Sequence, residues 1–182
     1  MRREQLEHVL RAAAEIAGTR DIIVLGSQAI LASVADDQLP LEATRSIEVD
    51  LAFIDDPDRT RADAVDGAIG ELSAFHAEFG YYAHGVELPT ARLPTGWRDR
   101  LVVLDTANTR PGRGLCLEPH DLVASKLAAW RAKDREYAGA LIRRGLVDRS
   151  VLLERIRLLE GVPVSMERLI SDWVEAAAVE SS

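Results

Sequence analysis

Two acidic residues with alternating spacing are the part of this sequence best suited to chemistry. Glu48 and Asp50, which we call the acid pair, lie in residues 47–53, where apolar and polar residues alternate as in a β-strand. A period of two places both carboxylates on one face, about 7 Å apart along the strand. Carboxylates in this arrangement suit a hard divalent cation. The alternative is that they form only the solvent face of an edge strand.

A glycine-serine turn precedes this strand. The apolar residues 21–25 predict a strand buried on both faces, and Gly26 and Ser27 then open a helix expected over residues 28–34. Glycine lets the backbone approach a ligand, the Ser27 hydroxyl can hydrogen-bond, and the free N–H groups of a first helical turn attract phosphate. We therefore expect a phosphate site at this turn, facing the acid pair.

The chain has only two lysines, Lys126 and Lys133. Their spacing of seven residues, in a segment with helical periodicity, predicts that they share one face of one helix, about 10 Å apart. Lys126 stands among apolar residues and could reach into a cleft to neutralise a triphosphate, with Arg131 and Asp134 close by. The alternative is a solvated amphipathic helix.

Other polar residues give weaker signals. A net charge of −8 argues against a broadly basic nucleic-acid-binding surface. Five arginines nevertheless cluster in sequence and predict either a local phosphate-binding patch or a solvated hairpin edge: Arg92, Arg98, Arg100, Arg110 and Arg113.

Cys116 is expected to be a small buried residue near a strand end. The spacing of the four histidines does not suggest a zinc site: His8, His76, His84 and His120.

The elements that must position these residues form an α+β pattern. A small mixed sheet with covering helices is expected in residues 1–117, followed by a helical part in residues 118–182 that packs on it. The expected strands are 21–25, 47–53, 81–88, 100–104 and 115–117, and the expected helices are 3–17, 28–34 and 60–79, with a loop over 36–45. From Glu118 onward we expect only helices: one that starts at Pro119 and breaks around Gly145, one over 148–160, and one over 165–178.

No apolar run approaches the roughly 18 residues that a membrane span needs. The N-terminal segment also lacks the features of a secretory signal. The default expectation is therefore a cytoplasmic protein that does not bind a membrane.

Taken together, these features resemble a known family. Gly26-Ser27 at a strand-to-helix turn, followed by Glu48-Val49-Asp50, is similar to the nucleotidyltransferase signature of glycine plus glycine or serine, and then acid-hydrophobic-acid. Residues 118–134 look like the helical segment of bacterial minimal nucleotidyltransferase-like proteins. That group belongs to the DNA polymerase β-type superfamily and is related to abortive-infection-type toxins. The resemblance covers about residues 6–160.

The resemblance implies a DNA polymerase β-like core with an assigned site. Gly26 and Ser27 would hold the phosphates of an NTP, and the acid pair would hold Mg²⁺. The catalytic residues would be the acid pair together with Lys126, which would contact the triphosphate. Arg131 and Asp134 would bind or orient their neighbours beside the nucleotide. A third metal carboxylate, common on a neighbouring strand in full polymerases, has no clear match in this sequence; Glu87 is the first candidate and Asp105 the second.

Two functions from different classes follow from the resemblance. The first is an Mg²⁺-dependent enzyme that moves an NMP from an NTP to an RNA (such as tRNA) or protein acceptor, as a toxin–antitoxin component with an antitoxin partner. The second is a catalytically silent protein of the same fold that binds a nucleotide or a partner. Glu48, at a place where such sites usually carry Asp, favours the second function, whereas Asp50 and Lys126 favour the first.

Overall fold

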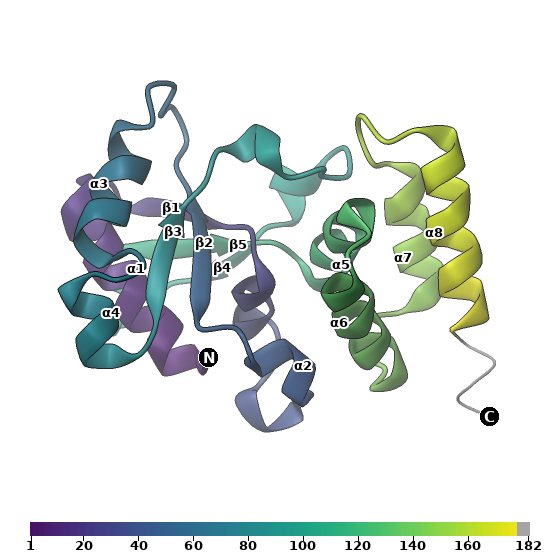
Figure 1. Ribbon diagram of the computed structural model, residues 1–182, viewed down its shortest axis with the longest axis horizontal. Coiled ribbons are helices and arrows are strands. Elements are labelled where there is room, and N and C mark those ends of the chain that lie inside the picture. The colour runs from purple at the N-terminus through teal and green to yellow at the C-terminus, as the bar shows by residue number, and fades with distance from the viewer. Residues whose placement is uncertain (178–182) are drawn as a thin grey trace.

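A mixed sheet occupies the N-terminal two thirds of the protein. The computed structural model describes residues 1–177, and within them a five-stranded sheet has the order β3-β2-β1-β5-β4 (Figure 1). Its strands are β1 (Asp21–Val24), β2 (Glu48–Ala52), β3 (Tyr82–Gly85), β4 (Val102–Leu104) and β5 (Arg113–Cys116). β1 is antiparallel to β2 and parallel to β5, β3 is parallel to β2, and β4 is antiparallel to β5. The expected α+β fold class is confirmed.

The two strands that carry the site lie inside this sheet. β1 is the central strand, and Ile22, Ile23 and Val24 are all buried, as its apolar sequence predicted. β2 lies between β1 and β3, so the acid pair is not on an edge strand. Val49 and Leu51 of β2 are fully buried on one face, which leaves the acid pair half-buried on the opposite face.

Three helices pack against the sheet on its buried side: α1 (Arg3–Ala17), α3 (Thr60–Ile69) and α4 (Ala74–Phe79) (Figure 1). The expected continuous helix over residues 60–79 is wrong, because the chain turns between α3 and α4. Leu72 adopts a φ of 63° in this turn, and the Ser73 hydroxyl accepts a hydrogen bond from the His76 backbone N–H to start α4. A serine that caps a new helix competes with continuation of the old one.

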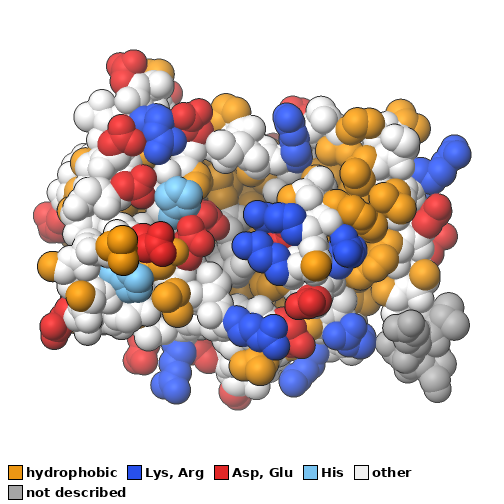
Figure 2. Space-filling model, in the orientation of Figure 1, with side chains coloured by type: hydrophobic (Ala, Val, Ile, Leu, Met, Phe, Trp, Pro, Cys, Tyr) orange, Lys and Arg blue, Asp and Glu red, His pale blue; other side chains and the backbone are white. Residues whose placement is uncertain are grey.

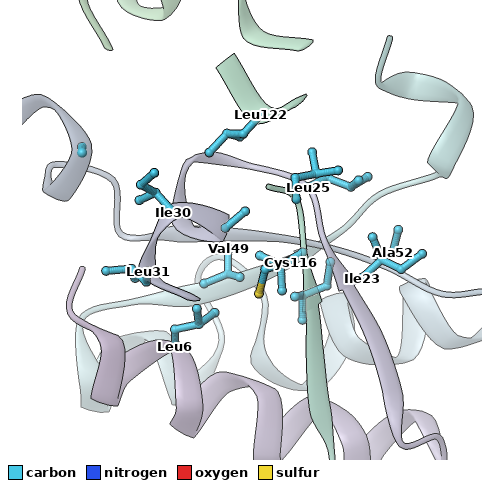
Figure 3. Packing of buried hydrophobic residues seen from close by; sticks show 14 of the residues in the cluster. Leu6, Ile23, Leu25, Ile30, Leu31, Val49, Ala52, Cys116 and Leu122 are labelled. Carbon is cyan, nitrogen blue, oxygen red and sulfur yellow. The ribbon is translucent and has the colours of Figure 1, made fainter. Parts of the chain in front are cut away.

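The segment after β1 also differs from the expected helix. Residues Ser27–Ala32 form a 3₁₀ helix, η1, instead of an α-helix over 28–34. The expected loop 36–45 contains a second 3₁₀ turn, η2 (Asp36–Gln38), and the short helix α2 (Leu41–Thr44). Figure 3 shows Ile30 and Leu31 of η1 in the same buried cluster as Val49 and Cys116.

The expectation for Cys116 is confirmed. It is the last residue of β5 and is fully buried. Burial raises the pKa of its thiol to about 12, because the thiolate would lose its hydration. β5 begins at Arg113, two residues before the strand expected from the sequence.

Between Glu118 and residue 177, the last one described, the named elements are all helices, as expected: α5 (Pro119–Ala129), α6 (Ala132–Arg143), α7 (Arg149–Arg157) and α8 (Val164–Ala176). The single helix from Pro119 to Gly145 is wrong. Trp130 adopts a φ of 53° and ends α5, and Arg131 is extended before α6 begins. Lys126 and Lys133 therefore lie on two different helices. Ala178, the expected last residue of the final helix, lies outside the described residues.

A buried ion pair joins the helical part to the sheet part. The Asp121 side chain of α5 has no exposed surface and accepts two hydrogen bonds from the Arg100 guanidinium, at 2.8 and 3.1 Å. Arg155 of α7 approaches the same carboxylate at 3.2 Å. Burial raises the pKa of Asp121, although Arg100 opposes this effect. The division at residue 117 into two domains remains a prediction, but the two parts are in direct contact.

Among the residues described, none of the helices has both the length and the apolar character that crossing a membrane requires.

Candidate functional site

The parallel pairing of β2 and β3 brings a histidine to the acid pair. Asp50 is paired in register with His84, so the two side chains extend from the same face of the sheet. The His84 Nδ1 atom lies 3.0 Å from Oε1 of Glu48 and 3.6 Å from Oδ1 of Asp50. One ligand atom from each of the three residues lies within 4.8 Å of the other two. We call these residues the acid–histidine group, and their donors can hold a divalent cation.

His84 is the residue of this group that sequence reasoning missed. The histidine spacing carried no signal, because the contact depends on the register between two strands that are 30 residues apart in sequence. The two acids suggested as a third carboxylate lie elsewhere. Glu87 pairs with Arg59 at 3.3 Å, and Asp105 pairs with Arg20 at 2.8 Å.

Gly26 touches the acid pair directly. A Cβ atom at this position would lie 1.8 Å from Oδ2 of Asp50 and 2.7 Å from its Cγ. The φ of Gly26 is −79°, which any residue can adopt, so glycine is needed here for space and not for backbone freedom. The close approach predicted for this glycine is therefore an approach to the Asp50 carboxylate.

Ser27 is the first residue of η1 and is held from the other side of the cavity. Its carbonyl oxygen accepts a hydrogen bond from the Tyr137 hydroxyl of α6 at 3.0 Å. Because η1 has only six residues and 3₁₀ geometry, aligned peptide dipoles can contribute less to anion binding than the expected α-helix would. Binding of phosphate at this turn would depend on the Ser27 hydroxyl and on nearby cationic side chains.

Lys126 is one of these cations, and it lines the same cavity as Ser27. Its side chain is 13% exposed, and its Nζ lies 3.5 Å from Oδ1 of Asp134 and 4.7 Å from the centre of the Tyr137 ring. Burial lowers the pKa of Lys126, while the carboxylates of Asp134 and Asp50 oppose that shift. A desolvated ammonium that faces carboxylates is a strong partner for a phosphate group, since fewer waters must be displaced.

Asp134 positions two cations at once. Its side chain is 1% exposed and accepts a hydrogen bond from Arg131 Nε at 2.6 Å, in addition to its contact with Lys126. Arg131 keeps 59% of its side chain exposed. The hydrogen bond to Asp134 raises the pKa of Arg131, and the charges of the acid pair add to the effect. We call Lys126 and Arg131 the cationic group.

Two neighbouring cavities meet between the acid–histidine group and the cationic group. The site cavity, about 510 Å³, is lined by Ser27, Lys133 and Asp134 in addition to both groups. The side cavity, about 400 Å³, shares Asp50 and the cationic group with it and is also lined by Gly26 and Arg92. Figure 2 shows acidic and histidine side chains over the sheet facing Lys and Arg side chains over the C-terminal helices, across a hollow.

The structure brings together the residues that the sequence assigned to metal and nucleotide binding, apart from the two candidates for a third carboxylate. Glu48, Asp50, Ser27, Lys126, Arg131 and Asp134 line the site cavity, and Gly26 lines the side cavity against Asp50. Lys133 also reaches the site cavity, although from α6 and not from a face shared with Lys126.

The five clustered arginines do not share one role. Arg100 is engaged by the buried Asp121, and Arg113 pairs with Asp21 at 2.6 Å. Arg98 lies over the ring of the neighbouring Trp97, at 5.1 Å from its centre. Arg92 is the member that lines a cavity of the site.

Comparison with known proteins agrees with this geometry. Residues 4–160, most of the chain, match a family described as "Nucleotidyltransferase of unknown function (DUF6036)". No curated protein and no solved structure matches the chain. The resemblance to nucleotidyltransferases that the sequence motifs indicated is thereby confirmed, and the chain belongs to the DUF6036 nucleotidyltransferase family.

Proposed function

We propose that the protein transfers an NMP from an NTP to an acceptor in a reaction that depends on a divalent cation. The observation that supports this most strongly is the pairing of opposite charges across one cavity. Asp50 and Lys126 line both the site cavity and the side cavity. Glu48 and His84 lie beside Asp50, and Arg131 lines the same two cavities as Lys126. A metal–triphosphate complex needs carboxylate ligands for its ion and cations for its phosphates, within a few ångströms of each other.

The donor set fits a divalent cation. Two carboxylates and an imidazole nitrogen converge, and Gly26 leaves room for the Asp50 carboxylate to stand where it does. The sequence predicts Mg²⁺ as that ion, because carboxylate oxygens are its usual protein ligands. A divalent cation held there would orient phosphate oxygens and lower the pKa of the attacking hydroxyl.

The protein's own side chains would hold the triphosphate. The Lys126 ammonium and the Arg131 guanidinium would neutralise phosphate oxygens from the side of the cavity opposite the acid pair, and the Ser27 hydroxyl would donate a hydrogen bond. Asp134 would orient both cations without touching the nucleotide, because its carboxylate is buried behind them. These roles rest on electrostatic positioning, which supplies most of the catalysis in phosphoryl-group chemistry.

A second cavity supports a reaction with two substrates. In-line transfer requires the acceptor oxygen and the leaving pyrophosphate on opposite sides of the α-phosphate. The two cavities meet at Asp50, Lys126 and Arg131, which is where that phosphate would lie. We assign the nucleotide to the site cavity and the acceptor to the side cavity, where Arg92 can meet an acceptor phosphate or carboxylate. An RNA such as tRNA and a protein side chain are the acceptor classes proposed, within a toxin–antitoxin system that includes an antitoxin partner.

Label transfer tests this proposal. The protein would be incubated with each NTP labelled at the α-phosphate and with a divalent cation, in parallel with total RNA and with a cell protein extract. Label is expected in one of the two acceptor classes, and γ-label is expected in neither. Asp50→Asn should abolish transfer, whereas the matched control Asp105→Asn, which removes a carboxylate paired with Arg20, should not.

The alternative function has its own outcome in this experiment. When calorimetric NTP titration accompanies label transfer, binding without transfer to any acceptor would identify a silent nucleotide-binding protein that keeps Glu48, Asp50 and His84 together. Absence of both binding and transfer would remove the proposal altogether.

A further inference from the structure

We propose that His84 is the third protein ligand of the divalent cation and that it makes the site prefer a first-row transition ion, such as Mn²⁺, over Mg²⁺. The inference rests on the proposed function, because it concerns the ion at the same site. It adds a ligand that the acid pair alone does not supply, and it changes the ion expected from the sequence.

The fold fixes His84 in its place. The neighbouring Gly85 N–H donates to Oδ1 of Asp66 at 2.7 Å, and a Cβ on Gly85 would lie 2.5 Å from the carbonyl oxygen of Ala62. This clamps β3 against α3. Because side chains alternate along a strand, Ala83 is buried beneath α3 and His84 must extend from the opposite face, toward Asp50.

One nitrogen of His84 contacts both acids of the pair, as expected where all three side chains bind one ion. Its Nδ1 faces both carboxylates of the acid pair, at 3.0 and 3.6 Å. A surface ion pair would need only one of them. The ring is half exposed and opens onto the site cavity, so it can reach an ion that enters with a nucleotide.

A second histidine–carboxylate contact in the structure shows the difference. The Nδ1 of His120 lies 2.5 Å from Glu118, but its Nε2 accepts a hydrogen bond from the Asp148 backbone N–H at 3.0 Å. Both nitrogens of His120 are thus used to join the starts of α5 and α7. Within residues 1–177, His84 makes no such hydrogen bond to a helix end, and it lies with two acids in a cavity.

The donor chemistry sets the preference for the ion. Mg²⁺ favours oxygen ligands and retains its waters, whereas first-row transition ions accept imidazole nitrogen more readily, Mn²⁺ the least strongly among them. A set of two carboxylates and one imidazole should therefore bind Mn²⁺ more tightly than Mg²⁺. The ratio of Mn²⁺ affinity to Mg²⁺ affinity should be larger for this set than for three carboxylates. Loss of an outer partner of a metal ligand already costs about 10- to 100-fold in affinity, so loss of a direct ligand should cost at least about tenfold.

The test measures metal binding directly. Mn²⁺ would be titrated, alone and in competition with Mg²⁺, into the wild-type protein, His84→Ala, His84→Asp and the control His76→Ala, and the free Mn²⁺ would be followed by electron paramagnetic resonance. The His76 ring packs against Tyr82 at a tilt of 44°, with the ring centres 4.7 Å apart, and His76 is not part of the group. We expect His84→Ala to weaken Mn²⁺ binding at least about tenfold, His84→Asp to lower the Mn²⁺-to-Mg²⁺ affinity ratio by a similar factor, and the control to behave as wild type.

Pulsed electron paramagnetic resonance on the bound Mn²⁺ gives a second readout, which would not change if His84 had only a structural role. A nitrogen coupling from imidazole to Mn²⁺ is expected in the wild-type protein and in His76→Ala, and it should vanish in both His84 variants. Mn²⁺ bound without nitrogen coupling, and equally tightly in His84→Ala, would overturn the inference and leave the carboxylate site of the proposed function intact. Failure of the wild-type protein to bind Mn²⁺ would also overturn the inference. Label transfer is measured in a separate experiment, so failure of this inference can be told apart from failure of the proposed function.

Discussion

The contact between Gly26 and Asp50 yields the sharpest structural prediction. In Gly26→Ala, the new methyl carbon would stand 1.8 Å from Oδ2 of Asp50 and 3.0 Å from its Cβ. Ordinary contact begins at about 3.4 Å. The carboxylate must therefore move by more than 1 Å or rotate away, which takes it out of the acid–histidine group.

The cost should fall on the site and not on the fold. The φ of Gly26 suits alanine, and the Asp50 side chain is 33% exposed, so it can rotate into solvent without a large loss of folding free energy. A displacement of about 1 Å at a reacting centre can cost about 100-fold in rate. We expect Gly26→Ala to lower divalent-cation affinity and nucleotidyl transfer by about that factor, while the free energy of unfolding changes by less than about 1 kcal/mol.

Gly67→Ala is the matched control. Gly67 lies within α3, and a Cβ there meets nothing within 4 Å. Alanine in a helix interior is favoured over glycine by up to about 1 kcal/mol, so this variant should be as stable as wild type or more so, with an unchanged site. Metal titration, label transfer and urea unfolding would be measured for both variants. The reasoning is refuted if Gly26→Ala binds the cation as wild type does, or if it loses function only because it unfolds.

Three further predictions concern single buried groups. Burial lowers the pKa of Lys126 below the ordinary lysine value of 10.5, so NTP affinity should fall as the pH rises through that lowered pKa. The Lys126→Arg variant should keep its NTP affinity to higher pH. NMR signals of the two labelled lysines would give the pKa. The same shift makes the unfolded state bind this proton more tightly, so the contribution of Lys126 to stability should increase with pH between its two pKa values. Cys116, whose pKa is raised to about 12, should resist a thiol reagent at neutral pH until the protein is unfolded in denaturant, and reaction of the native protein would contradict its burial. Asp121→Ala should lower the free energy of unfolding by about 3–5 kcal/mol, because it leaves two partly buried guanidinium groups, of Arg100 and Arg155, without their buried carboxylate. The exposed Asp99→Ala should change it by less than about 0.5 kcal/mol, and equal urea midpoints would show that this ion pair is not needed.

The sequence was informative where the chemistry depends on local periodicity. The alternation around Glu48 and Asp50 correctly predicted two carboxylates on one face, and the apolar run after Asp21 correctly predicted the central strand. Both follow from the period of two along a strand, which any strand imposes on its own residues. The family match then confirmed the nucleotidyltransferase resemblance that these motifs carried.

The contacts between distant segments could not be predicted in this way. His84 meets the acid pair only through the register of β3 on β2, which no local pattern specifies. Trp130 ends α5 with a positive φ that is uncommon for an aromatic residue, so helical periodicity ran through the break and placed the two lysines on one helix. The local arginine cluster predicts either a phosphate-binding patch or a solvated hairpin edge for Arg100, because its partner, Asp121, comes 21 residues later in the sequence.

The central claim is that one cavity binds a divalent cation and a triphosphate together, with Asp50 on the metal side and Lys126 on the phosphate side. Calorimetric titration of a non-hydrolysable NTP, with and without the cation, tests it most directly. We expect the cation to strengthen nucleotide binding to the wild-type protein, this effect to vanish in Asp50→Asn, and Lys126→Met to weaken nucleotide binding whether or not the cation is present. If the cation strengthened binding to Asp50→Asn as much as to wild type, the proposed site would be wrong.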